Sequence, residues 1–347
     1  MVIVDGEEPP PPPGQSGGKR QLTTLEGWQA FTSDVPDVPD LLPAPVRERL
    51  ADDERSRYDE RRLDYHTRLG VVATSTLRHV VTTGRRLTLL NRHAISARRG
   101  LIVSGAAGTG KTTAITQLGK THEATYRLRH PGMDRIPVVY VTVPPAATPR
   151  MLAVEFARFL GIPVIARANI TDVIEAVCGV MTDMRTTVVC VDEIHNLKLA
   201  TRNGAEVSDT LKYFSERIPA TFVYAGINVE REGLFTGTRG QQIAGRFTLI
   251  PATPFPYAAE WQGLVATLED ALRLHEHRPG ALAGLDRYLH QRTGGMIGSL
   301  SHLIRGAATE AILDGSEKIT RRLLDAVELD HAAQGRPASV AVKRKTA

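Results

Sequence analysis

The sequence predicts an α/β fold in which helices cover both faces of an open parallel sheet, followed by a smaller all-helical region. A glycine-rich phosphate-binding pattern, Gly105–Thr112, stands between an apolar run and a helix-compatible segment, which is the strand–loop–helix context this motif needs. Runs of β-branched residues then alternate with helical segments, and no strong strand signal follows Tyr257. Strands and helices that alternate in this way form a sheet that is buried on both faces.

Five short apolar runs are the predicted strands. They are Gly100–Ser104, Pro137–Val143, Thr186–Val191, Thr221–Ala225 and Phe247–Ile250. Three helices are expected between them, over Pro149–Leu160, Ile170–Met184 and Ser208–Glu216. We assign residues 99–256 to this α/β nucleotide-binding domain.

Two segments precede the α/β domain. Residues 1–45 are expected to be a disordered or Pro-rich arm, because Pro9–Pro13 and a Gly-rich stretch follow one another there. Residues 46–98 are expected to be helical. Charges of both signs at helical spacing predict an exposed helix over Val46–His66, and a second helix is expected over Leu69–Asn91.

The region after the α/β domain is expected to be helical throughout. Residues 257–331 form the predicted all-helical lid, with helices over Glu260–His275, Ala281–Arg292, Ile297–Leu313 and Thr320–Leu329. The tail, residues 332–347, is basic and is expected to be disordered.

Composition limits the classes of protein to which the chain can belong. The 347 residues carry a formal net charge of +5, which permits an anionic polymer as partner. Aromatic residues make up 5%, so recognition of single strands by base stacking is not favoured, and duplex backbone is the better candidate. No apolar run approaches the roughly 18 residues of a membrane span. Cys178 and Cys190 lie in apolar stretches and are expected to be reduced, so we predict a cytoplasmic protein without a membrane partner.

The phosphate-binding pattern predicts an ATP site. The residues expected around the phosphates are Gly105, Ala106, Ala107, Gly108, Thr109, Gly110, Lys111, Thr112 and Thr113. Glycines let backbone N–H groups point at the phosphates. Lys111 is expected to reach the β- and γ-phosphates, and the Thr112 hydroxyl to ligate Mg²⁺.

A pair of carboxylates follows the predicted strand that ends at Val191. Ligands bind at the carboxyl ends of strands in such sheets, which is where Asp192 and Glu193 fall. We expect Asp192 to hold the Mg²⁺ shell and Glu193 to polarise a water for attack on the γ-phosphate. An acidic turn without function is the alternative. We interpret the nearby His195 as structural, because a lone His after a strand usually is.

Two further polar residues are expected to act in catalysis. Asn228 follows the strand Thr221–Ala225 and is predicted to contact the γ-phosphate or the attacking water, with a plain turn residue as the alternative. Arg246 is predicted to contact the transition-state phosphate, because a planar guanidinium suits that contact. Arg239 competes for this role, and a solvated surface arginine is the alternative for both.

These motifs together resemble those of AAA+ ATPases, and in particular the TniB/TnsC-type ATPases of Tn7-like and Tn5053-like transposons, which are functional relatives of MuB. The residues that carry the resemblance are Gly105–Thr112, Val191–Leu197 with its Asp-Glu-Ile-His-Asn-Leu sequence, Gln242–Phe247 and Thr293–Leu300. The similarity covers roughly residues 65–330. It implies that residues 99–256 are the AAA+ domain and that Arg246 serves the nucleotide of a neighbouring subunit.

The resemblance also implies partners and a role. Proteins of this type form rings or filaments of identical subunits on duplex DNA, select the target site and activate a DDE-type transposase, often with a TniQ-like adaptor. Many AAA+ proteins place a nucleotide-binding arginine in the lid, whereas this chain has Gly298 there and Arg305 two turns later. That departure implies slow, regulatory ATP hydrolysis. Arg150 and Lys198 are weak candidates for DNA contact, with a solvated charge as the alternative.

Other classes of ATPase share the fold. A replication initiator or helicase loader of the Cdc6 type is expected to carry a winged-helix domain, for which the residues after Leu329 are too few. A signalling or defence ATPase acting as a nucleotide-gated scaffold usually carries an additional domain. A metabolic P-loop kinase is disfavoured by the helical lid and by the intersubunit arginine.

Overall fold

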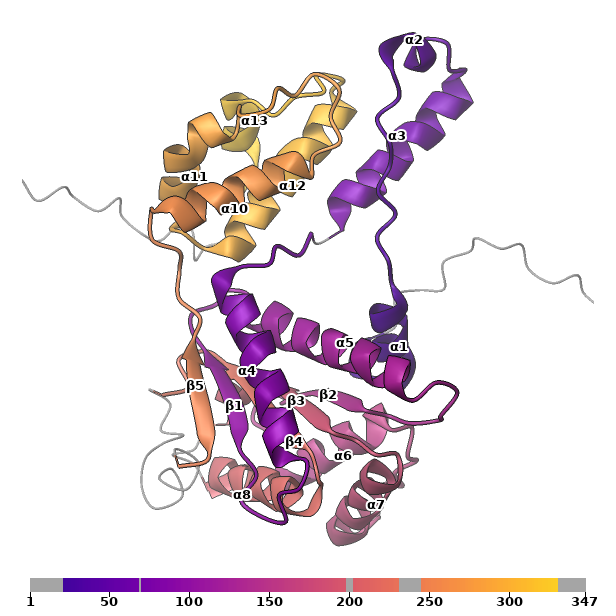
Figure 1. Ribbon diagram of the computed structural model, residues 1–347, viewed down its shortest axis with the longest axis vertical. Helices are drawn as coiled ribbons and strands as arrows, with labels where there is room; N and C mark the ends of the chain where they lie inside the picture. The colour runs from indigo at the N-terminus through magenta and orange to yellow at the C-terminus, as the bar shows by residue number, and fades with distance from the viewer. Residues whose placement is uncertain (1–20, 69, 198–201, 231–244, 330–347) are drawn as a thin grey trace, which may run out of the picture.

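A five-stranded parallel sheet forms the centre of the computed structural model, which describes residues 21–68, 70–197, 202–230 and 245–329 (Figure 1). Its strands are β1 (Gly100–Ser104), β2 (Val138–Thr142), β3 (Val188–Asp192), β4 (Thr221–Gly226) and β5 (Phe247–Pro251). They lie in the order β2-β3-β4-β1-β5, with β1 between the two strands that come last in the sequence. All five predicted strands are therefore present, each with ends within two residues of those predicted.

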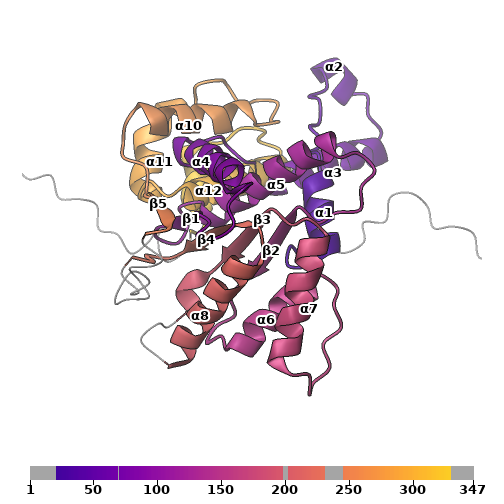
Figure 2. The ribbon, with the colours of Figure 1, turned by 60° about the horizontal axis from the view of Figure 1, so that its bottom comes forward.

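Strands β1 to β4 are apolar because helices cover both faces of the sheet there, whereas the edge strand β5 is largely exposed. Figure 2 shows α4 (Ser75–Asn91) and α5 (Lys111–Arg129) on one face, with α6 (Pro149–Phe159), α7 (Ile170–Asp183) and α8 (Arg202–Arg217) on the other. Every residue of β1, β3 and β4 is buried. The predicted α/β sheet with helices on both faces is confirmed.

A helix that the sequence analysis did not predict packs on α5. Residues 1–45 were expected to be a disordered or Pro-rich arm, but Leu25–Ser33 form α1, and the prediction is wrong for this stretch. The Trp28 side chain is fully buried, its Nε1 donates to Glu123 Oε2 at 2.5 Å, and its ring stacks on Tyr140 at 5.9 Å between centroids. Leu25 and Phe31 pack against the same core and are partly buried, but so few apolar positions in a nine-residue helix give too little periodicity to recognise.

A second hydrophobic core lies among the C-terminal helices. These are α10 (Ala259–Asp270), α11 (Asp286–Thr293), α12 (Ile297–Leu313) and α13 (Arg321–Ala326), with a 3₁₀ turn at Ala283–Leu285. Trp261, Leu289 and Leu303 are fully buried there. The predicted all-helical region after the sheet is confirmed, although α10 ends five residues earlier than expected.

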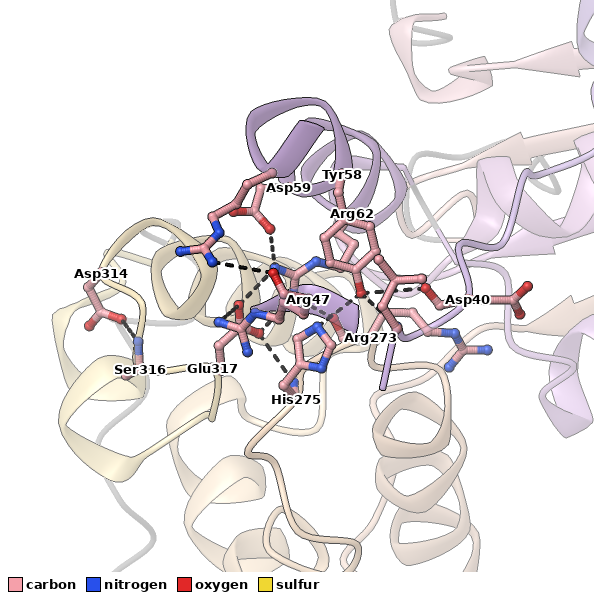
Figure 3. Close-up of polar contacts among 12 residues, drawn as sticks. Asp40, Arg47, Tyr58, Asp59, Arg62, Arg273, His275, Asp314, Ser316 and Glu317 are labelled. Carbon is pink, nitrogen blue, oxygen red and sulfur yellow. Dashed lines mark hydrogen bonds and ion pairs between the residues drawn. The ribbon is translucent and has the colours of Figure 1, made fainter. Parts of the chain in front are cut away.

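The first part of the N-terminal helical segment packs on this second core. This part comprises α2 (Ala44–Arg47) and α3 (Asp52–Thr67), and α3 lies against α12. Figure 3 shows polar contacts that join α3 to the C-terminal helices, among them an ion pair between Arg62 and Glu317. The sequence predicts an exposed helix here, whereas Arg62 and His66 are buried. The expectation is wrong for this face because paired charges in the sequence also fit buried ion pairs.

Helix α4, the second helix predicted for the N-terminal segment, begins later than the predicted Leu69. Its N-cap is Thr74, whose Oγ1 accepts from the backbone N–H of Leu77 at 3.1 Å, so the residues before it are not helical.

Several predictions concern parts of the chain outside the described residues: the first 20 residues of the arm, Lys198, Arg239 and the tail 332–347. Within the described ranges, no helix is long and apolar enough to span a membrane.

Candidate nucleotide site

A cleft of about 340 Å³ lies between the start of α4, the phosphate-binding loop and the start of α12. Residues 70–77 form one wall, the loop and the first turn of α5 form the floor, and the C-terminal helices form the other wall. The lining residues are Gly70, Val71, Val72, Thr74, Thr76, Leu77, Ala107, Gly108, Thr109, Gly110, Lys111, Thr112, Thr113, Ala114, Glu193, Ile227, Ile297, Gly298 and Ser301.

The loop has the backbone conformation that its glycines allow. Gly108 and Gly110 have φ angles of 76° and 85°, in the region that side chains with a Cβ rarely adopt. A Cβ on Gly105 would lie 1.8 Å from the carbonyl oxygen of Ala252, so only glycine fits there. Helix α5 starts at Lys111 without a side-chain cap, which leaves the positive end of its dipole facing the cleft.

Lys111 is held at the floor of the cleft. Its side chain is buried, and Nζ donates to the carbonyl oxygen of Ala106 at 2.7 Å. Burial lowers the pKa of Lys111, and the carboxylates of Asp192 and Glu193 act against that shift. A cation desolvated in this way attracts an anion more strongly than a cation in water does.

Asp192 is the centre of the hydrogen-bond network at the carboxyl end of β3. Its Oδ2 accepts from Thr112 Oγ1 at 2.7 Å and from the Tyr140 hydroxyl at 3.0 Å. Its Oδ1 accepts from the backbone N–H of Glu193 at 2.8 Å. The structure thus brings together the two residues predicted to serve Mg²⁺, Thr112 and Asp192, from α5 and β3.

Glu193 lines the cleft and has a left-handed backbone, with φ of 57°. Its Oε2 lies 3.2 Å from His195 Nε2, while the buried Nδ1 of His195 has no hydrogen-bond partner among the described residues. His195, which we had interpreted as structural, is therefore in contact with the predicted catalytic carboxylate.

Asn228 lies in the turn after β4. Its backbone is left-handed, with φ of 43°, a conformation that Asn tolerates well. Its neighbour Ile227 lines the cleft, whereas Asn228 stands outside the lining. This placement fits the alternative, a turn residue, and contact with the γ-phosphate stays a prediction.

Arg246 lies at the amino ends of the strands, whereas Lys111 lies beyond their carboxyl ends. Its carbonyl oxygen accepts from the N–H of Gly100, so Arg246 stands where β1 and β5 begin, whereas the phosphate-binding loop follows the end of β1. A five-residue strand separates the two ends by about 16 Å. Nη1 of Arg246 lies 3.3 Å from Glu216 Oε1 on α8. The structure does not bring Arg246 to the cleft of its own chain.

The C-terminal helices contact the phosphate-binding loop through the backbone. The N–H of Gly298 donates to the carbonyl oxygen of Gly108 at 2.9 Å, and a Cβ on Gly298 would lie 3.1 Å from that oxygen. Arg305 points elsewhere, and its guanidinium donates to the carbonyl oxygens of His66 and Thr67 at the end of α3. Arg305 therefore does not replace an arginine at position 298.

Several residues in or beside the cleft are not predicted by the sequence. Tyr140 was counted only as part of an apolar strand, and its hydroxyl bond to Asp192 depends on the register between β2 and β3. The wall formed by residues 70–77 and Ser301 carries no motif that could have identified it. Arg150, a candidate for DNA contact, donates to the carbonyl oxygens of Ala166 and Ala168 and fixes the loop before α7.

Comparison with solved structures identifies the fold. The Aeropyrum pernix ORC2 protein, solved as ADPNP-ADP complexes, matches with a TM-score of 0.57 and 17% identity, over 72% of this chain and 65% of that protein. The Aeropyrum pernix ORC1 protein in complex with DNA matches with a TM-score of 0.57 and 17% identity, over 78% and 66%. Drosophila ORC bound to DNA matches with a TM-score of 0.52 and 16% identity, over 86% and 72%.

These likenesses show that the chain has the fold of the AAA+ ATPases, with C-terminal helices after the sheet. The chain spans slightly under two thirds of the length of the two Aeropyrum pernix proteins, 65% and 66%. A search of curated proteins found no match. The family of bacterial TniB proteins matches residues 76–257, which include the phosphate-binding loop, Asp192, Glu193 and Arg246. The chain is therefore a P-loop protein of the AAA+ fold and belongs to the TniB family.

Proposed function

We propose that the chain is an ATP-dependent DNA-binding ATPase that assembles on duplex DNA, selects the target site and activates a DDE-type transposase. The observation that carries the proposal is the convergence of Lys111, Thr112, Asp192 and Glu193 at one end of the sheet, beside a cleft closed by the C-terminal helices. Family membership supports the role in transposition.

The cleft fits a nucleoside triphosphate with Mg²⁺. The uncapped start of α5 and the buried Lys111 supply positive charge for the phosphates. Thr112 and Asp192 supply a hydroxyl and a carboxylate, the oxygen ligands that Mg²⁺ prefers, and phosphates and water complete such a shell. When bound, Mg²⁺ neutralises charge on the phosphates. Thr112 and Asp192 would hold it, and the Tyr140 hydroxyl keeps Asp192 oriented.

Glu193 is the proposed general base. Its carboxylate lines the cleft and is 41% exposed, so a water molecule can reach it. His195 contacts this carboxylate and acts as a positioning residue. Hydrolysis would be slow, because Gly298 brings no positive charge to the phosphates from the C-terminal helices.

A neighbouring subunit would complete the site. Arg246 lies at the amino ends of the strands, at the opposite end of the sheet from the cleft of its own chain. It can therefore serve only the cleft of another copy. The nucleotide would then lie between two subunits, and its γ-phosphate would control assembly into a ring or a filament. Asn228 is the proposed contact to the γ-phosphate or the attacking water and would reach it from the turn after β4.

The proposed partners are duplex DNA, a DDE-type transposase and a TniQ-like adaptor. The net charge of +5 supports a polyanionic partner, and two of the structural neighbours are described as complexes with DNA. We also propose that the protein acts in the cytoplasm.

Strand transfer tests the proposal. The genes beside this one are expected to include one for a DDE transposase, and the purified transposase should insert donor ends into a target plasmid only with this chain and ATP. The Lys111→Ala variant serves as the negative control, and Lys318→Ala, which changes an exposed lysine, as the matched one. Strand transfer that is equally efficient without the chain would contradict the role.

A further inference from the structure

A second groove lies on the same two helices that carry the nucleotide cleft, and nothing in the proposed ATPase reaction uses it. It has a volume of about 640 Å³ and runs between the C-terminal halves of α4 and α5. The residues lining it are Val81, Thr82, Arg85, Thr88, Leu89, Asn91, Arg92, Leu118, Thr121, His122, Thr125, Tyr126, Arg129, His130, Thr187, Pro219 and Thr221.

The groove is basic, and none of the described residues that line it carries a carboxylate. Arg85, Arg92 and Arg129 are exposed, and no ion pair or side-chain hydrogen bond involves them among the described residues. The sequence explains this: between Asp64 and Glu123 there is no acidic residue. Glu123 itself is buried, where it accepts from Trp28 and Arg127. Among the residues that the structure describes, no carboxylate therefore neutralises the positive charge of these three arginines.

The arrangement of the positively charged side chains suits an extended polyanion. Arg78, Arg85 and Arg92 recur every seven residues along α4, so they share one face of the helix and are about 10 Å apart along its axis. A stripe of this length, about 20 Å, exceeds what a single small anion could cover. Arg129 stands on α5, across the groove from Arg85 and Arg92. Cations on two sides of a groove match a backbone of repeated phosphates better than one phosphate.

We propose that the groove between α4 and α5 is the surface on which this chain binds the phosphate backbone of duplex DNA, with Arg85, Arg92 and Arg129 as the principal contacts. The groove can have this role only if the chain binds duplex DNA, so the assignment rests on the proposed function and names the surface that the function needs. Thr82 and Thr121 also line the groove, and their hydroxyl groups suit phosphate oxygens.

The helices connect this groove to the nucleotide cleft. Thr76 and Leu77 at the start of α4, and Lys111 to Ala114 at the start of α5, line the cleft, whereas the far halves of the same helices line the groove. The two helices are closely packed at Gly84, where a Cβ would lie 2.4 Å from Leu118 Cδ2. A nucleotide that fixes the first turns of α4 and α5 therefore also fixes the separation of the arginines, which makes binding of DNA dependent on ATP.

The test is DNA affinity as a function of salt concentration. A triple variant, Arg85→Gln, Arg92→Gln and Arg129→Gln, is compared with the unaltered full-length chain by fluorescence anisotropy on a labelled duplex with a non-hydrolysable ATP analogue. Each phosphate contact contributes about 0.9 to the slope of log affinity against log salt, so the slope should become shallower by about 2 to 3. The matched control removes three exposed arginines that are paired with carboxylates, Arg61→Gln, Arg158→Gln and Arg321→Gln, and should leave the slope nearly unchanged.

Three outcomes would overturn the assignment, and they are distinguishable. If the unaltered chain binds no duplex, the DNA-binding part of the proposed function fails as well. If the unaltered chain and the groove variant bind with the same slope and affinity, only the groove assignment fails. If the groove variant keeps its DNA affinity but loses binding of polyglutamate, the groove serves an acidic protein segment instead. Nucleotide affinity, measured in parallel, should be equal for all variants.

Discussion

Arg62 and Glu317 form a buried bidentate ion pair between two segments that are 255 residues apart in the sequence. Nη1 of Arg62 lies 2.6 Å from Glu317 Oε2 and Nη2 lies 2.8 Å from Oε1, and both side chains are almost fully buried. The N–H of His275 donates to the same carboxylate, as Figure 3 shows. This pair ties α3 to the C-terminal helices, so α3 and these helices form one packed unit.

Replacing Glu317 by Gln should destabilise the chain strongly. The change leaves the guanidinium of Arg62 buried without its principal counter-charge, which typically costs about 3–5 kcal/mol. Asp37→Asn is the matched control, because Asp37 pairs with Arg61 at an exposed position, where such pairs contribute about 0–1 kcal/mol. The measurement is the free energy of unfolding of the full chain in urea at pH 7. Equal losses for the two variants would show that the buried pair does not stabilise this unit.

Low pH should lower the free energy of unfolding through His66, which lies on α3 where this helix packs on the C-terminal helices. Burial lowers the pKa of His66 to about 4, and the charges of Arg62 and Arg273 act in the same direction. Its Nε2 accepts from the N–H of Arg273, which requires the neutral ring. Between the unfolded pKa of about 6.5 and the folded value, the unfolded chain binds the additional proton, so stability falls as pH falls through this window, by up to about 1.4 kcal/mol per pH unit.

A His66→Gln variant checks the sign and the source of this dependence. Glutamine can still accept from Arg273 but does not titrate, so the loss of unfolding free energy between pH 6.5 and pH 5 should be smaller in the variant. Part of the dependence should persist, because burial also lowers the pKa of His122 to about 4. The same dependence in both proteins would exclude His66 as its source.

Glu193→Gln should retain nucleotide and stop hydrolysis. The amide cannot take a proton from water, and loss of a general base typically lowers a rate by roughly 10²–10⁴. Because the γ-phosphate then persists, assembled protein should accumulate. Phosphate release and nucleotide affinity are measured together, with Glu155→Gln as control, since Glu155 pairs with Arg158 on the surface of α6. Normal turnover by the Glu193 variant would show that another group activates the water.

Mixing two inactive variants tests whether Arg246 acts between subunits. Arg246→Ala should bind ATP but hydrolyse it slowly as an oligomer, and Lys111→Ala should bind no ATP. In a mixed oligomer, a Lys111→Ala subunit still offers Arg246 to the intact cleft of its neighbour, so part of the activity should return. If the mixture stays as inactive as its components, while Arg246→Ala alone is inactive, Arg246 does not act on a neighbouring nucleotide.

The sequence was sufficient to predict the parts of the molecule that follow local rules. Lys111, Thr112, Asp192 and Glu193 stand in short motifs whose spacing is set by the strand–loop–helix geometry, and the structure places all four at one end of the sheet. Apolar runs identified β1 to β4 because these strands are buried almost throughout, and the edge strand β5, which is largely exposed, was still recognised from its short apolar run.

The remaining features depend on contacts between distant residues. Trp28 is recognisable as a core residue only once Glu123 and Tyr140 are beside it. Likewise, Arg62 is one of many charged residues in its stretch of sequence, and only the fold brings Glu317 to it. Asn228 was predicted from its place after a strand, but the turn conformation sets it beside the cleft lining, and that depends on packing of the loop.

Electron microscopy of the full chain with duplex DNA tests the central claim most directly. With a non-hydrolysable ATP analogue, the unaltered chain should form rings or filaments on the DNA, and Lys111→Ala should form none, because its cleft no longer binds the phosphates. Glu193→Gln should form the same assemblies with ATP itself. Absence of any DNA-dependent oligomer of the unaltered chain, under conditions where it binds the analogue, would contradict the account.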